Sequence, residues 1–190
     1  MSKKYFQSYH MSSDYDGSKH EVGMFYNGAD KAVVHDGAIV TFGDLEDHRV
    51  YSMKDWDEYK VSAPKAISDD FAVVDVVERS NGNIMGVNYR EGVKTVDMTI
   101  EAGIPCNVRR LEHFDKVIFA SGNFTADKAP EKGKFATATA NDTLLTVVDE
   151  KPTGVLKYFE IKDSKPLVEG MIDTDVQYLC ILHEVAKETI

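Results

Sequence analysis

The side chains best suited to hold a metal ion or to move protons in this chain are six histidines, and the sequence does not group them. They are His10, His20, His35, His48, His113 and His183. No two of them stand two or four residues apart, the spacings at which a strand or a helix presents two imidazoles to one ion. An alternative is a site brought together by folding, with the members His35, Asp36, Asp44 and His48. We expect instead that these histidines make ordinary hydrogen bonds, and we predict no metal site.

Carboxylates also occur in close pairs that would be able to supply a general acid and a general base. The pairs are Asp69 with Asp70, Asp127 with Glu131, and Asp173 with Asp175. Each pair lies beside residues typical of turns, where carboxylates usually face water or accept a hydrogen bond from a backbone amide. We therefore interpret the pairs as loop residues without a catalytic role.

The two cysteines are the remaining candidates for chemistry. Cys106 precedes Asn107 and stands near His113, residue types that suit a thiol nucleophile. An apolar strand around Cys106 would raise the pKa of its thiol and weaken it as a nucleophile. We expect Cys106 and Cys180 to be buried free thiols. The glycines lack the spacing of a phosphate-binding loop, so we expect no cofactor. Together with the arguments on the histidines, carboxylates and cysteines, this leads us to expect no catalytic residue.

Composition limits the class of protein. The chain has 190 residues, of which 43% are hydrophobic and 28% charged, enough apolar material for a packed core. Its 22 Lys and Arg against 32 Asp and Glu give a formal net charge of −10, which argues against nucleic acid as a partner. The sequence contains no apolar stretch near the roughly 20 residues of a membrane span, and it starts with polar and aromatic residues. We therefore expect no membrane association, and assembly in the cytoplasm.

Short apolar segments separated by Gly, Asn, Asp or Pro recur along the chain, without a long amphipathic helix among them. They are residues 38–42, 71–77, 104–111, 116–120, 134–139, 144–148, 155–161 and 178–185. This punctuation predicts an all-β protein with a small barrel or sandwich body over residues 31–190, as one unit or as two lobes of about 31–103 and 104–190. Asp36 and Gly37 favour a hairpin, or a strand entered through a tight turn, because both residue types tolerate positive φ.

Aromatic residues stand out in two segments that lack aliphatic core material. Residues 1–30 are interpreted as an extended N-terminal arm that binds a neighbouring chain. Its anchors would be Tyr5, Phe6, Tyr9 and Tyr15. The second segment is charged and irregular, and its aromatic residues would form a surface on which a ligand can stack. These are Tyr51, Trp56 and Tyr59.

Several strand and turn segments of this chain resemble those of a known family. They are Asp-Gly-Ala-Ile-Val-Thr-Phe-Gly-Asp-Leu at 36–45, Val-Tyr at 50–51, Phe-Ala-Val-Val-Asp at 71–75, Glu-Ala-Gly at 101–103 and Arg-Arg-Leu at 109–111. A β-barrel half with Gly-rich turns follows in the pattern, here at 116–119, 133–135 and 178–184. In this pattern the chain is similar to the capsid decoration proteins of tailed bacteriophages, which stabilise the head. The resemblance implies a virion protein on the capsid exterior, with the major capsid protein as its partner and with homo-oligomers, such as trimers, as its form. The N-terminal arm and the segment around Trp56 have no counterpart in the pattern.

Three hypotheses of different classes follow. The first is a non-enzymatic virion structural protein that binds and stabilises the head. The second is a β-barrel module that binds carbohydrate or another ligand, as in a head fibre or a tail component. The third is a hydrolase with a dispersed His/Asp site.

Overall fold

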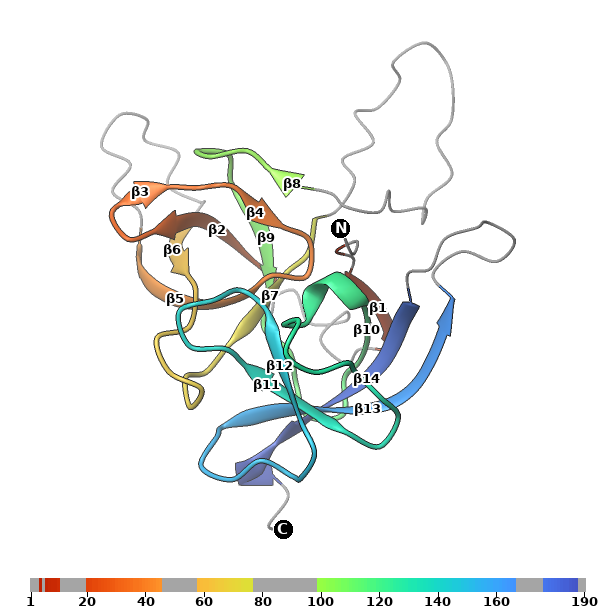
Figure 1. Cartoon of the computed structure of the whole chain (residues 1–190). Coiled ribbons are helices and arrows are strands. Elements are labelled where there is room, and N and C mark those ends of the chain that lie inside the picture. The colour runs from red at the N-terminus through yellow and green to blue at the C-terminus, as the bar shows by residue number, and fades with distance from the viewer. Residues whose placement is uncertain are drawn as a thin grey trace.

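The computed structural model describes residues 4, 6–10, 20–45, 58–76, 99–166 and 176–187 (Figure 1). These residues form strands joined by turns, together with the short 3₁₀ helices η3 (Ser121–Asn123) and η4 (Val185–Lys187). The expected all-β class is therefore confirmed. Tyr5, Tyr15, His48, Tyr51 and Trp56 lie outside the described residues, as do Asp173 and Asp175.

Five strands close into a barrel. In order around it they are β2 (His20–Asn27), β6 (Glu58–Ser62), β5 (Ile39–Leu45), β7 (Ala72–Val74) and β9 (Cys106–Arg109), and β9 pairs back with β2. The β2–β6 pair is parallel, and the other pairs of the barrel are antiparallel. Three two-residue strands lie at one end: β3 (Asp30–Lys31) on β2, and β4 (Val34–His35) paired with β8 (Thr99–Ile100). Closure leaves the five strands without a free edge over their paired residues.

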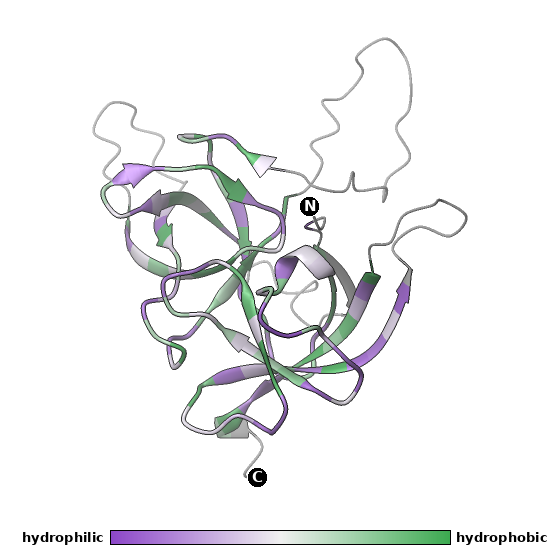
Figure 2. Cartoon of the chain, in the orientation of Figure 1, coloured by the Kyte–Doolittle hydropathy of each residue, from purple (hydrophilic) through white to green (hydrophobic). Residues whose placement is uncertain are grey.

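The second unit is a six-stranded antiparallel sheet beside the barrel (Figure 1). Its order is β1 (Phe6–His10), β10 (Lys116–Ala120), β14 (Val176–Glu184), β13 (Lys157–Pro166), β11 (Phe135–Ala138) and β12 (Leu145–Val148). In Figure 2, apolar residues recur along β14, whereas the C-terminal part of β13 is hydrophilic. The barrel takes its strands from residues 20–109 and the sheet from 6–10 and 116–184.

Strands β5 and β7 of the barrel contribute side chains to two cores, because these side chains alternate between the two faces of each strand. Val40 and Val74 point into the barrel. Ile39 and Val73 point the other way, into a core between the barrel and the sheet that also contains Phe159. Successive side chains of a strand face opposite sides, so two strands buried on both faces can serve both cores. The two units therefore pack as one body.

Asp36 joins the two units through hydrogen bonds to the backbone. Its side chain is fully buried, and its two carboxylate oxygens accept the N–H groups of Phe6 and Val76, each at 2.9 Å. Its backbone carbonyl accepts a hydrogen bond of 2.9 Å from Nδ2 of Asn123. A buried carboxylate is tolerated when hydrogen bonds replace its water shell. One side chain thus links β1, the end of β7 and the turn before β5.

Gly37 completes this turn because only a residue without Cβ fits. Its φ is +73°, and its N–H donates to the carbonyl of Val74 at 2.9 Å. A Cβ here would lie 2.5 Å from Nδ2 of Asn123 and 3.0 Å from Cβ of Phe6. The turn leads into β5, which pairs with β6 and β7. Of the two predicted alternatives, a hairpin or a strand entered through a tight turn, the structure therefore has the second.

The N-terminal segment differs from the expected arm. β1 pairs with β10 of the same chain, and β2 is a barrel strand. Phe6 is completely buried in the core beneath the sheet, with its ring centroid 5.4 Å from that of Phe119. The interpretation of Phe6 as an anchor on a neighbouring chain is therefore wrong, because the edge of β10 and the Asp36 carboxylate bind its backbone within the chain. Tyr9 lies in β1, and its partner role stays a prediction.

Replacing Asp36 by Asn should destabilise the protein strongly. The amide NH₂ of Asn would face one of the two backbone N–H donors, leaving a buried donor unsatisfied at a cost of about 1–3 kcal/mol. Urea denaturation of Asp36→Asn measures this, with Asp44→Asn as the control because Asp44 is exposed on β5. Equal midpoints for the two variants would contradict the assigned role of Asp36.

Replacing Phe6 by Ala should lower the free energy of unfolding by about 3–5 kcal/mol, the usual cost of truncating a buried Phe. The matched control is Phe114→Ala, because Phe114 is 61% exposed. Thermal or urea denaturation checks the difference between the two variants. If Phe6→Ala were as stable as the wild type, the N-terminal strand would be an arm after all.

Candidate functional site

The structure does not unite the dispersed His/Asp site. Asp36 is a buried structural residue before the start of β5, whereas Asp44 is exposed near the other end of that strand. His48 lies outside the described residues. Among the residues that the structure describes, no group of three or more His, Cys, Asp or Glu side chains could hold a metal ion.

The described acidic pairs behave as loop residues. Asp69 accepts the backbone N–H groups of Lys65 and Ala66 at 2.8 and 2.9 Å, so it closes a turn. Asp70 forms a 2.7 Å ion pair with Lys157. Asp127 and Glu131 are exposed. These positions agree with the interpretation of the pairs as turn and surface residues.

Both cysteines are buried free thiols, as expected. Cys106 lies on β9, and its Sγ is 3.1 Å from the carbonyl oxygen of Gly23. Burial raises the pKa of the Cys106 thiol from 9.0 to about 12. Burial also raises the pKa of Cys180, which is completely buried. Both thiols are therefore protonated near neutral pH, a state in which they are poor nucleophiles.

One surface feature is a cluster of rings at the end of β14, which we call the Phe114 patch and define as His113, Phe114, Tyr158 and His183. Phe114 is 61% exposed, and its backbone has φ of +70°. Its N–H donates to the carbonyl of Leu182 at 2.8 Å, which fixes the turn against β14. A large side chain with positive φ is uncommon and costs strain, and such residues concentrate at functional sites.

The other rings hold Phe114 in place. Its ring centroid lies 3.9 Å from that of His113 and 5.7 Å from that of His183. His183 stacks on Tyr158 at 5.1 Å with an interplanar angle of 10°, and its Nε2 lies 3.2 Å from a carboxylate oxygen of Glu160. The patch is therefore a fixed aromatic surface built from two strands and a turn.

Polar contacts fix the imidazole of His113 and place a second apolar side chain near the patch. Nδ1 of His113 accepts the N–H of Glu184 at 2.9 Å, so this nitrogen carries no proton in that hydrogen bond. Leu156 is 54% exposed, and its carbonyl accepts the N–H of Val185 at 3.0 Å. Phe114 and Leu156 thus flank the end of β14 on both sides. An exposed aromatic ring on a fixed backbone, such as Phe114, is a typical anchor of a protein interface.

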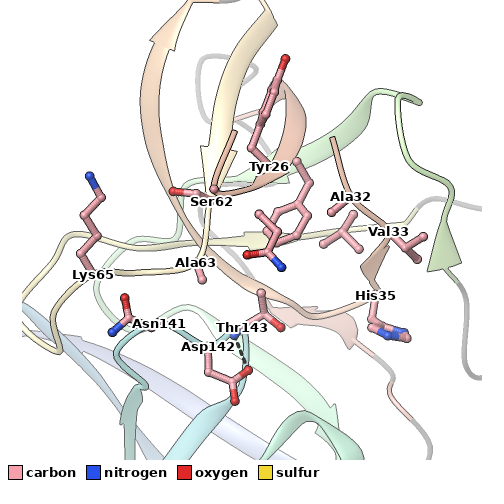
Figure 3. Close-up of a pocket in the computed structure, with 14 residues that line it drawn as sticks. Tyr26, Ala32, Val33, His35, Ser62, Ala63, Lys65, Asn141, Asp142 and Thr143 are labelled. Carbon is pink, nitrogen blue, oxygen red and sulfur yellow. Dashed lines mark hydrogen bonds between the residues drawn. The ribbon is translucent and has the colours of Figure 1, made fainter. Parts of the chain in front are cut away.

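A second feature is a cavity of about 590 Å³ at the end of the barrel, where β2 and β6 finish (Figure 3). Tyr26, Ser62 and Ala63 line it from the barrel. Residues 32–35, which follow β3 and include β4, form another wall, and residues 141–143 of the β11–β12 connection lie opposite. The barrel and the sheet both contribute to this cavity.

Main-chain hydrogen bonds between the barrel and the sheet hold the segments that line the cavity. The N–H of Ile39 donates to the carbonyl of Thr143 at 2.8 Å, and the N–H of Asn141 donates to the carbonyl of Pro64 at 2.6 Å. Asn141 has φ of +60°, a conformation that Asn tolerates better than most residues. The polar side of the cavity is thus held in one conformation by the body of the protein.

Of the three residues expected to form a ligand platform, only Tyr59 is described. Its ring makes an edge contact with Phe42 at 5.3 Å between centroids, and it packs against the barrel core. No sequence pattern pointed to Tyr26 as a ligand residue or to Phe114 as a surface residue. The cavity joins segments more than 100 residues apart, which no local pattern can reveal, and the one available signal for Phe114 was a large aromatic residue in a turn.

No described helix is both long and apolar enough to cross a membrane. Comparisons of the chain with models of protein families, with curated proteins and with solved structures find no match in any of the three.

The buried thiols predict a specific chemical behaviour. In the folded protein at pH 8, neither cysteine should react with Ellman's reagent on the time scale of minutes, whereas both should react in denaturant. The raised pKa of Cys106 also means that the unfolded chain loses this proton first, so its contribution to stability is complete below about pH 9 and is lost as the pH rises toward 12. Rapid modification of one thiol in the native protein would contradict this assignment.

Proposed function

We propose that this chain is a non-enzymatic structural protein of a tailed bacteriophage, which binds the major capsid protein on the outside of the head and stabilises the shell. The observation that carries the proposal is where the segments that resemble decoration proteins lie in the fold. A multi-copy role of this kind requires a rigid body with a docking surface, and the Phe114 patch is the surface that we propose for docking.

Three of the resembling segments, far apart in the sequence, are neighbours in space. Residues 36–45 form the Asp36 turn and β5, residues 71–75 contain β7, and residue 109 ends β9. β5 pairs with β7, and β7 pairs with β9. Nε of Arg109 donates to the carboxylate of Asp75, and both side chains belong to the resembling segments. These three segments therefore belong to one structural unit, the barrel, and their proximity supports the proposal.

The Phe114 patch supplies a surface for binding a capsid. Aromatic side chains with few accessible rotamers are the usual anchors of protein interfaces. Phe114 is exposed and its backbone is fixed, so it loses little freedom on binding. Many copies on one shell would add avidity to a modest contact. The net charge of −10 favours a basic rim on the partner. A role in a head fibre or a tail component would use the same body.

Adding this protein to particles that lack it should raise the temperature at which they release their genome, because a ligand that binds only the intact assembly stabilises it by mass action. Release is followed by the fluorescence of a DNA-binding dye during heating. Phe114→Ala should require at least tenfold more protein for the same protection. Leu45→Ala is the matched control, since Leu45 is 50% exposed on β5.

The dependence on salt distinguishes the electrostatic contribution to binding from the contribution of the aromatic contacts. Raising ionic strength should slow association, because charges more than about 10 Å apart are largely screened at about 0.1 M salt. Dissociation through aromatic contacts should change little. Particles that resist heat equally well with and without the protein would remove the stabilising role, and full protection by Phe114→Ala would remove the patch as the anchor.

A further inference from the structure

We propose that the cavity at the end of the barrel is a binding site for a neutral hexose unit of a glycan. This inference does not depend on the proposed capsid role, because it concerns a different surface. The argument rests on the size of the cavity, on the unequal chemistry of its two sides and on the hydrogen bonds that hold it.

The cavity has the size and position of a small-ligand site. Its volume of about 590 Å³ lies within the roughly 300–1,000 Å³ of typical ligand pockets. It also lies where two structural units meet at the mouth of a barrel, a common place for such sites. Three separate parts of the chain enclose it, so a ligand there can be contacted from several directions.

The two sides of the cavity differ in polarity. The side formed by residues 32–34, together with Phe25 and Ala63, is apolar, and Val33 is 45% exposed. The opposite side carries the amide of Asn141, the carboxylate of Asp142 and the hydroxyl of Thr143, as Figure 3 shows. A pyranose ring has a matching division, with C–H groups on one face and hydroxyls around its edge. A wholly apolar ligand would leave these polar groups without water or partners, at a cost in free energy.

The polar side is preorganised to accept hydroxyl donors. The bonds from Ile39 to Thr143 and from Asn141 to Pro64 fix the connection against the barrel. One carboxylate oxygen of Asp142 accepts the N–H of Thr143 at 2.6 Å, which orients the side chain. A carboxylate can accept about four hydrogen bonds, so Asp142 retains capacity for sugar hydroxyls. A site fixed before binding loses less entropy when the ligand arrives.

Charge favours a neutral sugar over an acidic one. Asp142 lines the cavity with a negatively charged side chain, and the whole chain carries a net charge of −10. Lys31 and Lys60 lie near the outer rim, with their Nζ atoms 6.0 and 5.8 Å from the centroid of the Tyr26 ring. Neither of them lines the cavity, whereas Lys65 does, with its ammonium group directed away from the other labelled side chains in Figure 3.

The test is titration of the full chain with the methyl glycosides of glucose, galactose and N-acetylglucosamine, followed by saturation-transfer NMR. We expect at least one of these glycosides to bind with a dissociation constant in the millimolar range. Saturation should be strongest on its ring C–H protons, which would face the apolar side. Asp142→Ala should weaken binding at least tenfold, whereas Asp149→Ala, an exposed Asp outside the cavity, should leave it unchanged.

A second variant guards against loss of folding. Val33→Trp fills the cavity from a partly exposed position and should abolish binding, while thermal denaturation shows that the fold is kept. Failure of all three glycosides to bind at 50 mM would overturn the proposal. Binding that survives both Asp142→Ala and Val33→Trp would do the same, as would binding of methyl glucuronide alone. None of these outcomes affects the capsid experiment, which depends on Phe114.

Discussion

The hydrogen bonds of the buried Asp36 carboxylate determine how the two halves of this protein fit together. Its oxygens accept hydrogen bonds from the backbone N–H groups of Phe6 and Val76, which are 30 and 40 positions away in the chain. One side chain therefore connects the N-terminal strand, the turn before β5 and the end of β7. Burying a carboxylate is costly unless such donors meet it. Phe6 is drawn into the core as a consequence, and the N-terminal strand becomes part of the body.

The rigid body of the protein holds both surface features, the Phe114 patch and the cavity, in fixed positions. β5 and β7 contribute to both cores, so the barrel and the sheet cannot shift relative to each other without disturbing packed side chains. The Phe114 patch lies at the end of β14, and the cavity lies where the sheet meets the barrel. Both are therefore presented by fixed elements, as a docking surface and a ligand site require.

The sequence predicts the strands well and their partners poorly. Segments such as 71–77 and 116–120 are bounded by turn residues, so their strand character is a local property. β1 has the sequence Phe-Gln-Ser-Tyr-His, and its strand character comes from pairing with β10, more than 100 residues later. Closure of the barrel by β2 and β9 is equally non-local. The burial of the two thiols could be predicted from the apolar residues around them in the sequence. The positive φ of Phe114 and the meeting of distant segments at the cavity could not, because they depend on tertiary structure.

An exposed Phe114 ring, held on a rigid body by a backbone hydrogen bond, is the feature that we propose to bind a large, repetitive surface. The most direct measurement of this role is electron cryo-microscopy of the native assembly from which the protein is isolated. Binding to a capsid predicts β-rich density of this shape on the outside of an icosahedral shell, with Phe114 facing the major capsid protein. Sedimentation of the native protein apart from any shell, or density with Phe114 facing solvent, would contradict the account.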